Sequence, residues 1–268
     1  MSNIQNNPHK QSFRIRNNFG YMYHVAQRNL FWKIYYYLFG APFMSAHIIN
    51  KLIRKYYTFT PGQNILDYGC GDGIFLNHLC YEFDSTGVGV ERILSRVRIA
   101  KLASDKFKLK SNFINSPFHN FKTREKFDVA LCLDVLEHVD NPAKEIKKIF
   151  TLLKHKGTLI IRVPYGEDKK YLLKEDVFMY GKDKHVKTGL TEIELKRFLT
   201  KCGFKVEGYV YHFYFISQII YEILELLRRK NQILYAFAWP FLFPLCQLDT
   251  YCLKWGKPNG LLVIAHKP

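Results

Sequence analysis

The chain has 268 residues, of which 48% are hydrophobic and 16% aromatic, and it carries a formal net charge of +17. This composition can fill the core of one domain with additions, and it argues against a disordered chain. The six cysteines are dispersed without a Cys-x-x-Cys pair, which argues against a disulfide framework or a zinc cluster and is typical of reduced thiols in a cytosolic protein.

The first 60 residues differ from the rest of the chain. Residues 1–18 are polar and basic and lack the apolar run of a secretory signal, so we expect no such signal. From Tyr21 to Tyr57, aromatic and aliphatic residues recur at helical spacing, and the run at 40–42 interrupts them. We therefore expect residues 1–60 to form a flexible arm and at least two helices on the substrate side of the protein.

From Asn64 onward, short apolar runs alternate with longer stretches of helical periodicity. This alternation is typical of a parallel β-sheet with helices on both faces. The predicted strands are 64–68, 85–90, 110–114, 127–133, 157–163, 205–215 and 260–266, and the predicted helices are 74–81, 93–102, 142–153 and 191–202. Residues 61–268 are thus expected to form one doubly wound α/β domain.

Residues 216–253 form an insertion before the last predicted strand. A helical apolar pattern ends in the basic cluster 228–230, and an apolar, aromatic run follows at 233–248, broken by Pro240 and Pro244. This run is shorter than the roughly 20 residues that cross a bilayer, and its prolines argue against a transmembrane helix. Two interpretations stay open, a buried lid over the substrate and a hairpin that contacts an anionic membrane.

A glycine-rich loop follows the first predicted strand, in the run Asn64-Ile-Leu-Asp-Tyr-Gly-Cys-Gly-Asp-Gly73. Glycines at this spacing allow the backbone to turn tightly and to approach a bound ligand closely. Asp67 ends the strand and can accept a hydrogen bond from a cationic or hydroxyl group. Glu91 ends the next strand about 20 residues after the glycines, where a carboxylate can accept both hydroxyls of a ribose. Together these features predict a nucleotide-type site.

The loop, Glu91 and the run Phe127-Asp-Val-Ala-Leu-Cys-Leu-Asp-Val-Leu-Glu-His-Val139 resemble the class I S-adenosylmethionine-dependent methyltransferases, and specifically their ubiquinone-pathway O-methyltransferase branch. The resemblance extends from about Asn64 to Gly203. It implies a Rossmann-like sheet of seven mostly parallel strands in the order 3-2-1-4-5-7-6, with the last strand antiparallel. It also implies S-adenosyl-L-methionine as the cofactor.

The resemblance implies a role for each site residue. The loop would hold the methionine part of the cofactor, Glu91 the ribose, and Asn115 with Ser116 the adenine, where the family usually has an acid. Asp134 would border the sulfonium and the substrate. The implied cofactor-binding residues are Asp67, Gly69, Cys70, Gly71, Gly73, Glu91, Asn115, Ser116 and Asp134.

Asp134, Glu137 and His138 follow the fourth strand, and His185 precedes a later helix. Two carboxylates and two imidazoles are a plausible set for a magnesium-type cation. They resemble the ExxEH element of ubiquinone-pathway and small-RNA 2′-O-methyltransferases, although Asp134 is one methylene shorter than the family's residue. Without a metal, the candidate catalytic groups are His138, Asp134 and His185, with an imidazole as general base.

The acceptor is left open by the sequence. We expect O-methylation of a small-molecule, glycan or lipid-linked acceptor by a cytoplasmic protein at the inner face of a membrane. The net charge leaves an RNA 2′-O-methyltransferase as the alternative, although no separate RNA-binding module is visible. A cofactor-binding subunit without activity is a third alternative, and the sequence does not indicate an oligomeric state.

Overall fold

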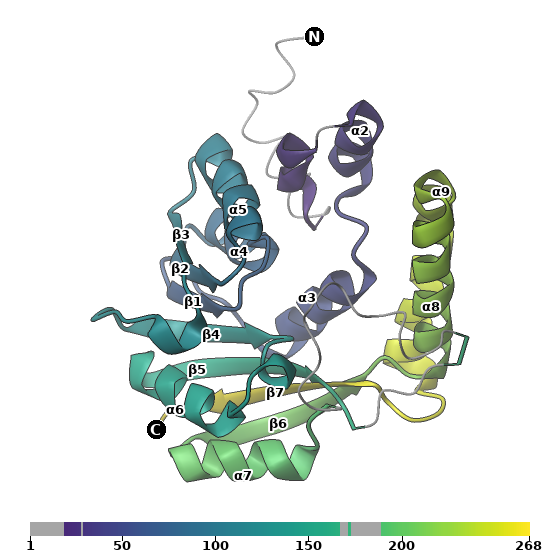
Figure 1. Cartoon of the computed structure of the whole chain (residues 1–268). Helices are drawn as coiled ribbons and strands as arrows, with labels where there is room; N and C mark the ends of the chain where they lie inside the picture. Colours follow the sequence, from purple (N-terminus) through teal and green to yellow (C-terminus); the bar gives the residue numbers. More distant parts are fainter. Residues whose placement is uncertain (1–18, 28, 167–170, 173–188) are drawn as a thin grey trace. The chain divides into compact units, whose positions relative to one another are not determined.

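The computed structural model describes residues 19–268, apart from residues 28, 167–170 and 173–188 and the side chains of residues 250 and 251. Seven strands form one sheet in the order β3-β2-β1-β4-β5-β7-β6 (Figure 1), which confirms the predicted order. The strands are β1 (Asn64–Tyr68), β2 (Thr86–Glu91), β3 (Ser111–Asn115), β4 (Phe127–Leu133), β5 (Leu153–Pro164), β6 (Lys205–His212) and β7 (Gly260–His266).

Helices alternate with these strands in the chain order that the sequence predicts. Apart from the single-turn helices η2 (Phe118–Asn120) and η3 (Leu136–His138), they are η1 (Tyr21–Ala26), α2 (Leu30–Phe39), α3 (Met44–Tyr56), α4 (Ile74–Glu82), α5 (Leu94–Phe107), α6 (Pro142–Leu152), α7 (Glu192–Cys202), α8 (Phe215–Lys230), α9 (Gln232–Leu248) and the π-helical turn η5 (Asp249–Leu253). None of the helices in the described ranges is both long and apolar enough to cross a membrane.

The chain divides into two compact units. The first unit comprises Met1–Phe43 and Asn50–Leu131, and the second comprises Met44–Ile49 and Cys132–Pro268. The contacts group the N-terminal helices η1 and α2 with residues 50–131. The domain boundary expected at residue 60 stays a prediction.

In the first unit, β1 pairs in parallel with β2 and β4, and β2 pairs in parallel with β3. The side chains of Ile65 and Leu66 are fully buried, as a central parallel strand with two covered faces requires. Gly89 is obligatory in β2, because a Cβ there would lie 2.5 Å from the ring of Phe113 and 2.8 Å from the sulfur of Cys70. The carboxyl ends of these strands carry the glycine loop and Glu91.

In the second unit, β7 pairs antiparallel with both β5 and β6. β6 ends at His212, three residues before the predicted end of the strand, because Phe213 adopts a left-handed backbone (φ 57°) and Phe215 begins α8. α7 begins at a capping box in which Thr191 and Glu194 satisfy each other's backbone N–H groups.

The insertion is a pair of helices, α8 and α9, that lie side by side (Figure 1). The prediction that Pro240 and Pro244 break the apolar run is wrong, since α9 continues through both. Burial of one side of α9 compensates the missing backbone hydrogen bonds: Trp239 is buried and stacks on Phe243, with ring centroids 4.8 Å apart.

Candidate functional site

The loop after β1 has the backbone that the glycine spacing predicts. Gly69, Gly71 and Gly73 have φ of 90°, 53° and 74°, a left-handed region that side chains rarely adopt. At Gly73, which caps α4, a Cβ would also lie 2.7 Å from the Cβ of Ala100. At Gly71, by contrast, the nearest atom to such a Cβ would be Nη1 of Arg96, at 3.7 Å. The loop is therefore packed tightly at the helix and open above Gly71, where a ligand could approach the backbone.

Glu91 is held against this loop by its own carboxylate. Its Oε2 accepts a hydrogen bond from the N–H of Gly71 at 3.0 Å, and its Oε1 accepts one from the N–H of Ile93 at 2.8 Å. The side chain is buried, and the N–H groups of Gly69 and Cys70 both donate to the carbonyl of Val90. Glu91 thus fixes the loop to the end of β2, so both predicted elements lie at one place in the first unit.

Asp67 is a buried carboxylate whose hydrogen-bonding capacity is half used. The carboxylate accepts a hydrogen bond from the backbone of Leu76, while its Oδ2 atom has no hydrogen-bond partner among the described residues. Burial first, and then the carboxylate of Glu91, raise the pKa of Asp67 to about 7. Such an unpaired carboxylate is costly and is relieved when a cation binds to it.

A second acid missed by the sequence analysis, Asp72, adds to the negative charge. Burial also raises its pKa, the guanidinium of Arg96 lowers it, and Glu91 raises it further. Glu91 thus lies within electrostatic range of both Asp67 and Asp72, and one basic group, Arg96, acts on Asp72. The arrangement suits a ligand that carries positive charge, such as an ammonium or a sulfonium.

Two tyrosines of the N-terminal helices face this cluster and were also missed. Tyr23 of η1 is buried, and its hydroxyl accepts a hydrogen bond from Nδ2 of Asn77 at 2.9 Å. Burial raises the pKa of Tyr23 well above its usual value, and Asp72 contributes to this shift. Tyr36 of α2 also has a pKa raised by burial and then by Asp72. Only long-range packing reveals these contacts, since nothing in the aromatic periodicity of residues 21–57 singles out either tyrosine.

Asn115 and Ser116 lie at the end of β3, beside Glu91. Nδ2 of Asn115 donates to the carbonyls of Glu91 and Arg92, at 3.0 and 2.9 Å, and the N–H of Ser116 donates to the carbonyl of Glu91 at 3.1 Å. Both residues therefore shape the turn after β2. The expected contact of Asn115 with adenine stays a prediction and would fall to its amide oxygen.

In the second unit, Asp134 follows β4 in a left-handed conformation (φ 56°). Its N–H donates to the carbonyl of Arg162 in β5 at 2.9 Å, and its carboxylate forms a salt bridge with the guanidinium of Arg162. Glu137 is fully buried nearby, and burial, followed by repulsion from Asp134, raises its pKa to about 8. The pKa of the His212 imidazole is lowered well below its usual value, first by burial and then by the positive charge of Arg162. One guanidinium therefore neutralises Asp134 and helps keep His212 uncharged.

The predicted metal site does not assemble in the part of the chain that the structure describes. This part contains no group of three or more His, Cys, Asp or Glu side chains arranged to hold an ion. Asp134 is committed to Arg162, a contact that the sequence pattern did not reveal. His138 ends the single-turn helix η3 close to Asp134 in sequence, and His185 lies outside the described residues.

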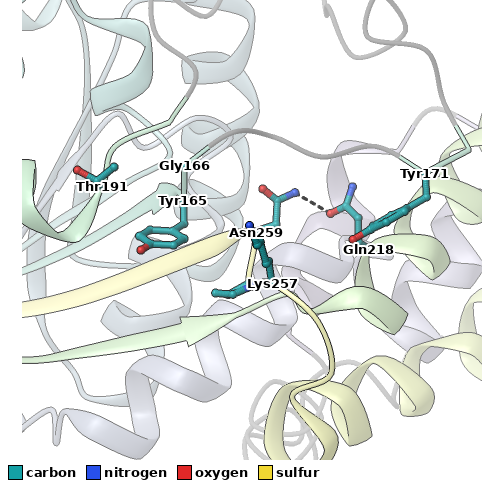
Figure 2. Close-up of a pocket in the computed structure, with 8 residues that line it drawn as sticks. Tyr165, Gly166, Tyr171, Thr191, Gln218, Lys257 and Asn259 are labelled. Atoms are coloured by element: carbon teal, nitrogen blue, oxygen red, sulfur yellow. Dashed lines mark hydrogen bonds between the residues drawn. The ribbon is translucent and has the colours of Figure 1, made fainter.

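A pocket of about 470 Å³ lies in the second unit (Figure 2), at the carboxyl end of β5. Ligands of α/β sheets bind at this end of the strands. The side chain of Asn259 donates to that of Gln218 at 2.8 Å, and Tyr165 and Tyr171 lie on either side of this pair. The lining residues are Tyr165, Gly166, Tyr171, Thr191, Gln218, Lys257, Pro258 and Asn259. None of these described residues is acidic, so the pocket suits a neutral or anionic molecule.

The geometry agrees with comparisons to known proteins. A family model described as a methyltransferase domain matches residues 43–208, more than half of the chain. The ubiquinone biosynthesis O-methyltransferase of Rickettsia bellii is 29% identical over 133 residues, which are 49% of this chain and 54% of that protein. The chain thus spans about half the length of the curated relatives it matches.

Solved structures share the fold. Phosphoethanolamine N-methyltransferase 2 of Haemonchus contortus, in complex with S-adenosylhomocysteine, superimposes with a TM-score of 0.61 at 20% identity, covering 87% of this chain and 56% of that one. Coclaurine N-methyltransferase gives 0.60 at 16% identity, covering 82% of this chain and 72% of that one. With the matching family model, the strand order and the glycine loop joined to Glu91, the chain belongs to the class I S-adenosylmethionine-dependent methyltransferases.

Proposed function

We propose that the protein transfers a methyl group from S-adenosylmethionine to a hydroxyl oxygen of a small or lipid-linked acceptor. The observation that carries the cofactor part is Asp67, a buried carboxylate with an unpartnered oxygen beside a glycine loop that is open above Gly71. The residues fit the cofactor, because its ammonium and sulfonium groups are positive and this cluster is negative.

The residues of the first unit bind and orient. Asp67 would pair with the ammonium of the methionine part, and the backbone of Gly71 would lie against the cofactor. Glu91 would accept hydrogen bonds from the ribose with the oxygen lone pairs that Gly71 and Ile93 leave free. When bound, S-adenosylmethionine supplies an activated methyl group, so the protein's main task is to align the acceptor oxygen with it.

The pocket at the end of β5 would hold the acceptor. Its phenol and amide groups can bind hydroxyl groups, and Lys257 can pair with a phosphate or carboxylate. The acceptor's hydroxyl proton must leave during the transfer. Of the candidate bases, Asp134 is neutralised by Arg162, so we assign the proton to His138 or to solvent.

The test is a methyl-transfer assay with S-adenosylmethionine labelled on the methyl group. Acceptors would include polyprenyl-linked phenols, glycolipids and free phenols, together with RNA, because the net charge is +17. Labelled product from a lipid-linked or small hydroxyl acceptor supports the proposal, and label only in RNA contradicts it. Binding of S-adenosylhomocysteine with no transfer to any acceptor would favour the cofactor-binding subunit.

A further inference from the structure

Helix α9 exposes a continuous apolar stripe to solvent. Six side chains at helical spacing form it, and we call them the α9 face: Ile233, Leu234, Phe237, Phe241, Leu245 and Leu248. Phe237 is 64% exposed and Phe241 76% exposed. Leu253 and Trp255, just beyond the helix, are exposed to a similar extent. A monomeric soluble protein rarely exposes so many neighbouring large apolar side chains, so we expect the stripe to contact a partner or a membrane.

The opposite side of α9 is packed within the second unit. Cys246 is fully buried and lies 3.1 Å from the sulfur of Met44 in α3. The ring of His47 contacts those of Trp239 and Phe243, at 5.5 and 5.3 Å between centroids. The packed side anchors α9, which fixes the direction of the α9 face.

The charges around the α9 face are one-sided. No residue from Gln232 to Leu248 is charged. Arg229 and Lys230 are exposed before the helix, and Lys254 and Lys257 are exposed after it. The nearby acids are turned inward. Glu225 accepts hydrogen bonds from Arg228 and Arg229, and Asp249 accepts one from the backbone N–H of Ser217. Both ends of the apolar stripe are thus positive.

We propose that the α9 face lies in the interface of an anionic lipid bilayer, with the helix parallel to the membrane surface. A 17-residue helix is short for a span, whereas an apolar stripe between two basic ends fits the acyl boundary and the anionic headgroups at once. Trp255, beside Lys254, is of the type enriched at that depth. Between the lid and the hairpin left open by the sequence, the exposure of this stripe favours the hairpin.

A second copy of the chain fits this face less well. Pairing two α9 helices in either direction sets basic ends against basic ends, and α9 offers no acidic side chain to offset the repulsion. An anionic bilayer, by contrast, complements both ends. This inference rests on α9 and its flanks and does not depend on the proposed methyl transfer.

The test is sedimentation of the full chain with vesicles of phosphatidylcholine, with and without phosphatidylglycerol. We expect binding to the anionic vesicles, reduced at least about tenfold in Phe237→Gln/Phe241→Gln and weakened by salt. The matched control is Ile193→Gln on α7, since Ile193 is 79% exposed and lies outside the α9 face. Lys230→Glu/Lys254→Glu should also reduce binding, whereas Lys196→Glu on α7 should reduce it less.

A second readout uses Trp255 as a reporter. Vesicles with brominated acyl chains should quench its fluorescence, and this quenching should be largely lost in Trp255→Phe, because Trp239 is buried and Trp32 lies on α2, outside the α9 face. Retained binding of S-adenosylhomocysteine would show that each variant is folded. The proposal is overturned if wild type does not sediment with anionic vesicles, or if the α9 variant binds as wild type does. It is also overturned if the α9 substitutions only dissociate a dimer in light scattering.

Discussion

The backbone N–H of Gly71 donates to Oε2 of Glu91 at 3.0 Å, so the two main elements of the proposed cofactor site are hydrogen-bonded to each other within the protein. Glu91 also accepts from Ile93, and it therefore holds the glycine loop and the start of the next helix in one arrangement. This preorganisation reduces the ordering that binding of a nucleoside would require.

Glu91→Gln tests this role. An amide can accept through one oxygen only, so one of the two backbone N–H groups loses its acceptor and the ribose loses a charged partner. We expect binding of S-adenosylhomocysteine to weaken by about 1–3 kcal/mol, the range for hydrogen bonds to charged groups. Calorimetry measures this, with the exposed Glu125→Gln as the control. Unchanged affinity in Glu91→Gln would show that the carboxylate has no part in binding.

The buried Asp67 should make folding stability depend on pH. Its pKa is about 7 in the folded protein and near 3.8 when unfolded, so the folded state binds more protons between these values. The free energy of unfolding should then fall as pH rises across this window, by at most about 1.4 kcal/mol per unit from this group. Glu137, with a pKa of about 8, should extend this decrease in the free energy of unfolding to higher pH.

Asp67→Asn should flatten this pH dependence and raise stability at pH 8, because it removes an unpaired buried charge. Urea unfolding of both proteins at pH 5.5 and pH 8 gives the comparison. Equal slopes for the variant and wild type would mean that Asp67 is ionised throughout, against the burial seen in the structure.

The salt bridge between Asp134 and Arg162 leads to a prediction about metals. A carboxylate neutralised by a guanidinium is a poor ligand for a divalent cation, so EDTA should leave methyl transfer unchanged. Arg162→Met should free Asp134 and lower activity, since it also leaves the buried Glu137 without its compensating cation. Loss of wild-type activity in EDTA, restored by magnesium, would revive the metal site predicted from the sequence.

Substitutions of the pocket residues should change the KM for the acceptor and leave the affinity for the cofactor unchanged. Lys257→Met should raise the KM for an anionic acceptor by roughly tenfold, the effect of one charge-assisted hydrogen bond, with S-adenosylhomocysteine affinity unchanged. Tyr165→Phe should have a smaller effect, because the ring keeps its packing against Tyr211. If both variants have wild-type KM values for every acceptor, the acceptor binds elsewhere.

Local patterns were enough to predict the sheet and the conformation of the glycine loop. The glycine spacing and the acid at the end of the next strand place Gly71 and Glu91 correctly, because both follow directly from where parallel strands end. The same reasoning placed β4 and Asp134.

The remaining features depend on contacts between distant residues. No local pattern pairs Asp134 with Arg162, 28 residues later, or brings Tyr23 to Asn77, 54 residues later. Pro240 and Pro244 indicated a break, and the packing of Trp239 and its neighbours overrides that local preference. The exposed face of α9 likewise follows from which side packs, which the composition of the run does not reveal.

The most direct test of the account is calorimetric titration with S-adenosylhomocysteine, performed on wild type and Asp67→Asn from pH 6 to pH 8. We expect wild-type affinity to rise with pH and to level off above about pH 7, because the ammonium of the ligand needs the ionised carboxylate of Asp67. The variant should bind at least about tenfold more weakly at pH 8 and show no such rise. Wild-type affinity in a folded Asp67→Asn protein would contradict the assignment of the cofactor site.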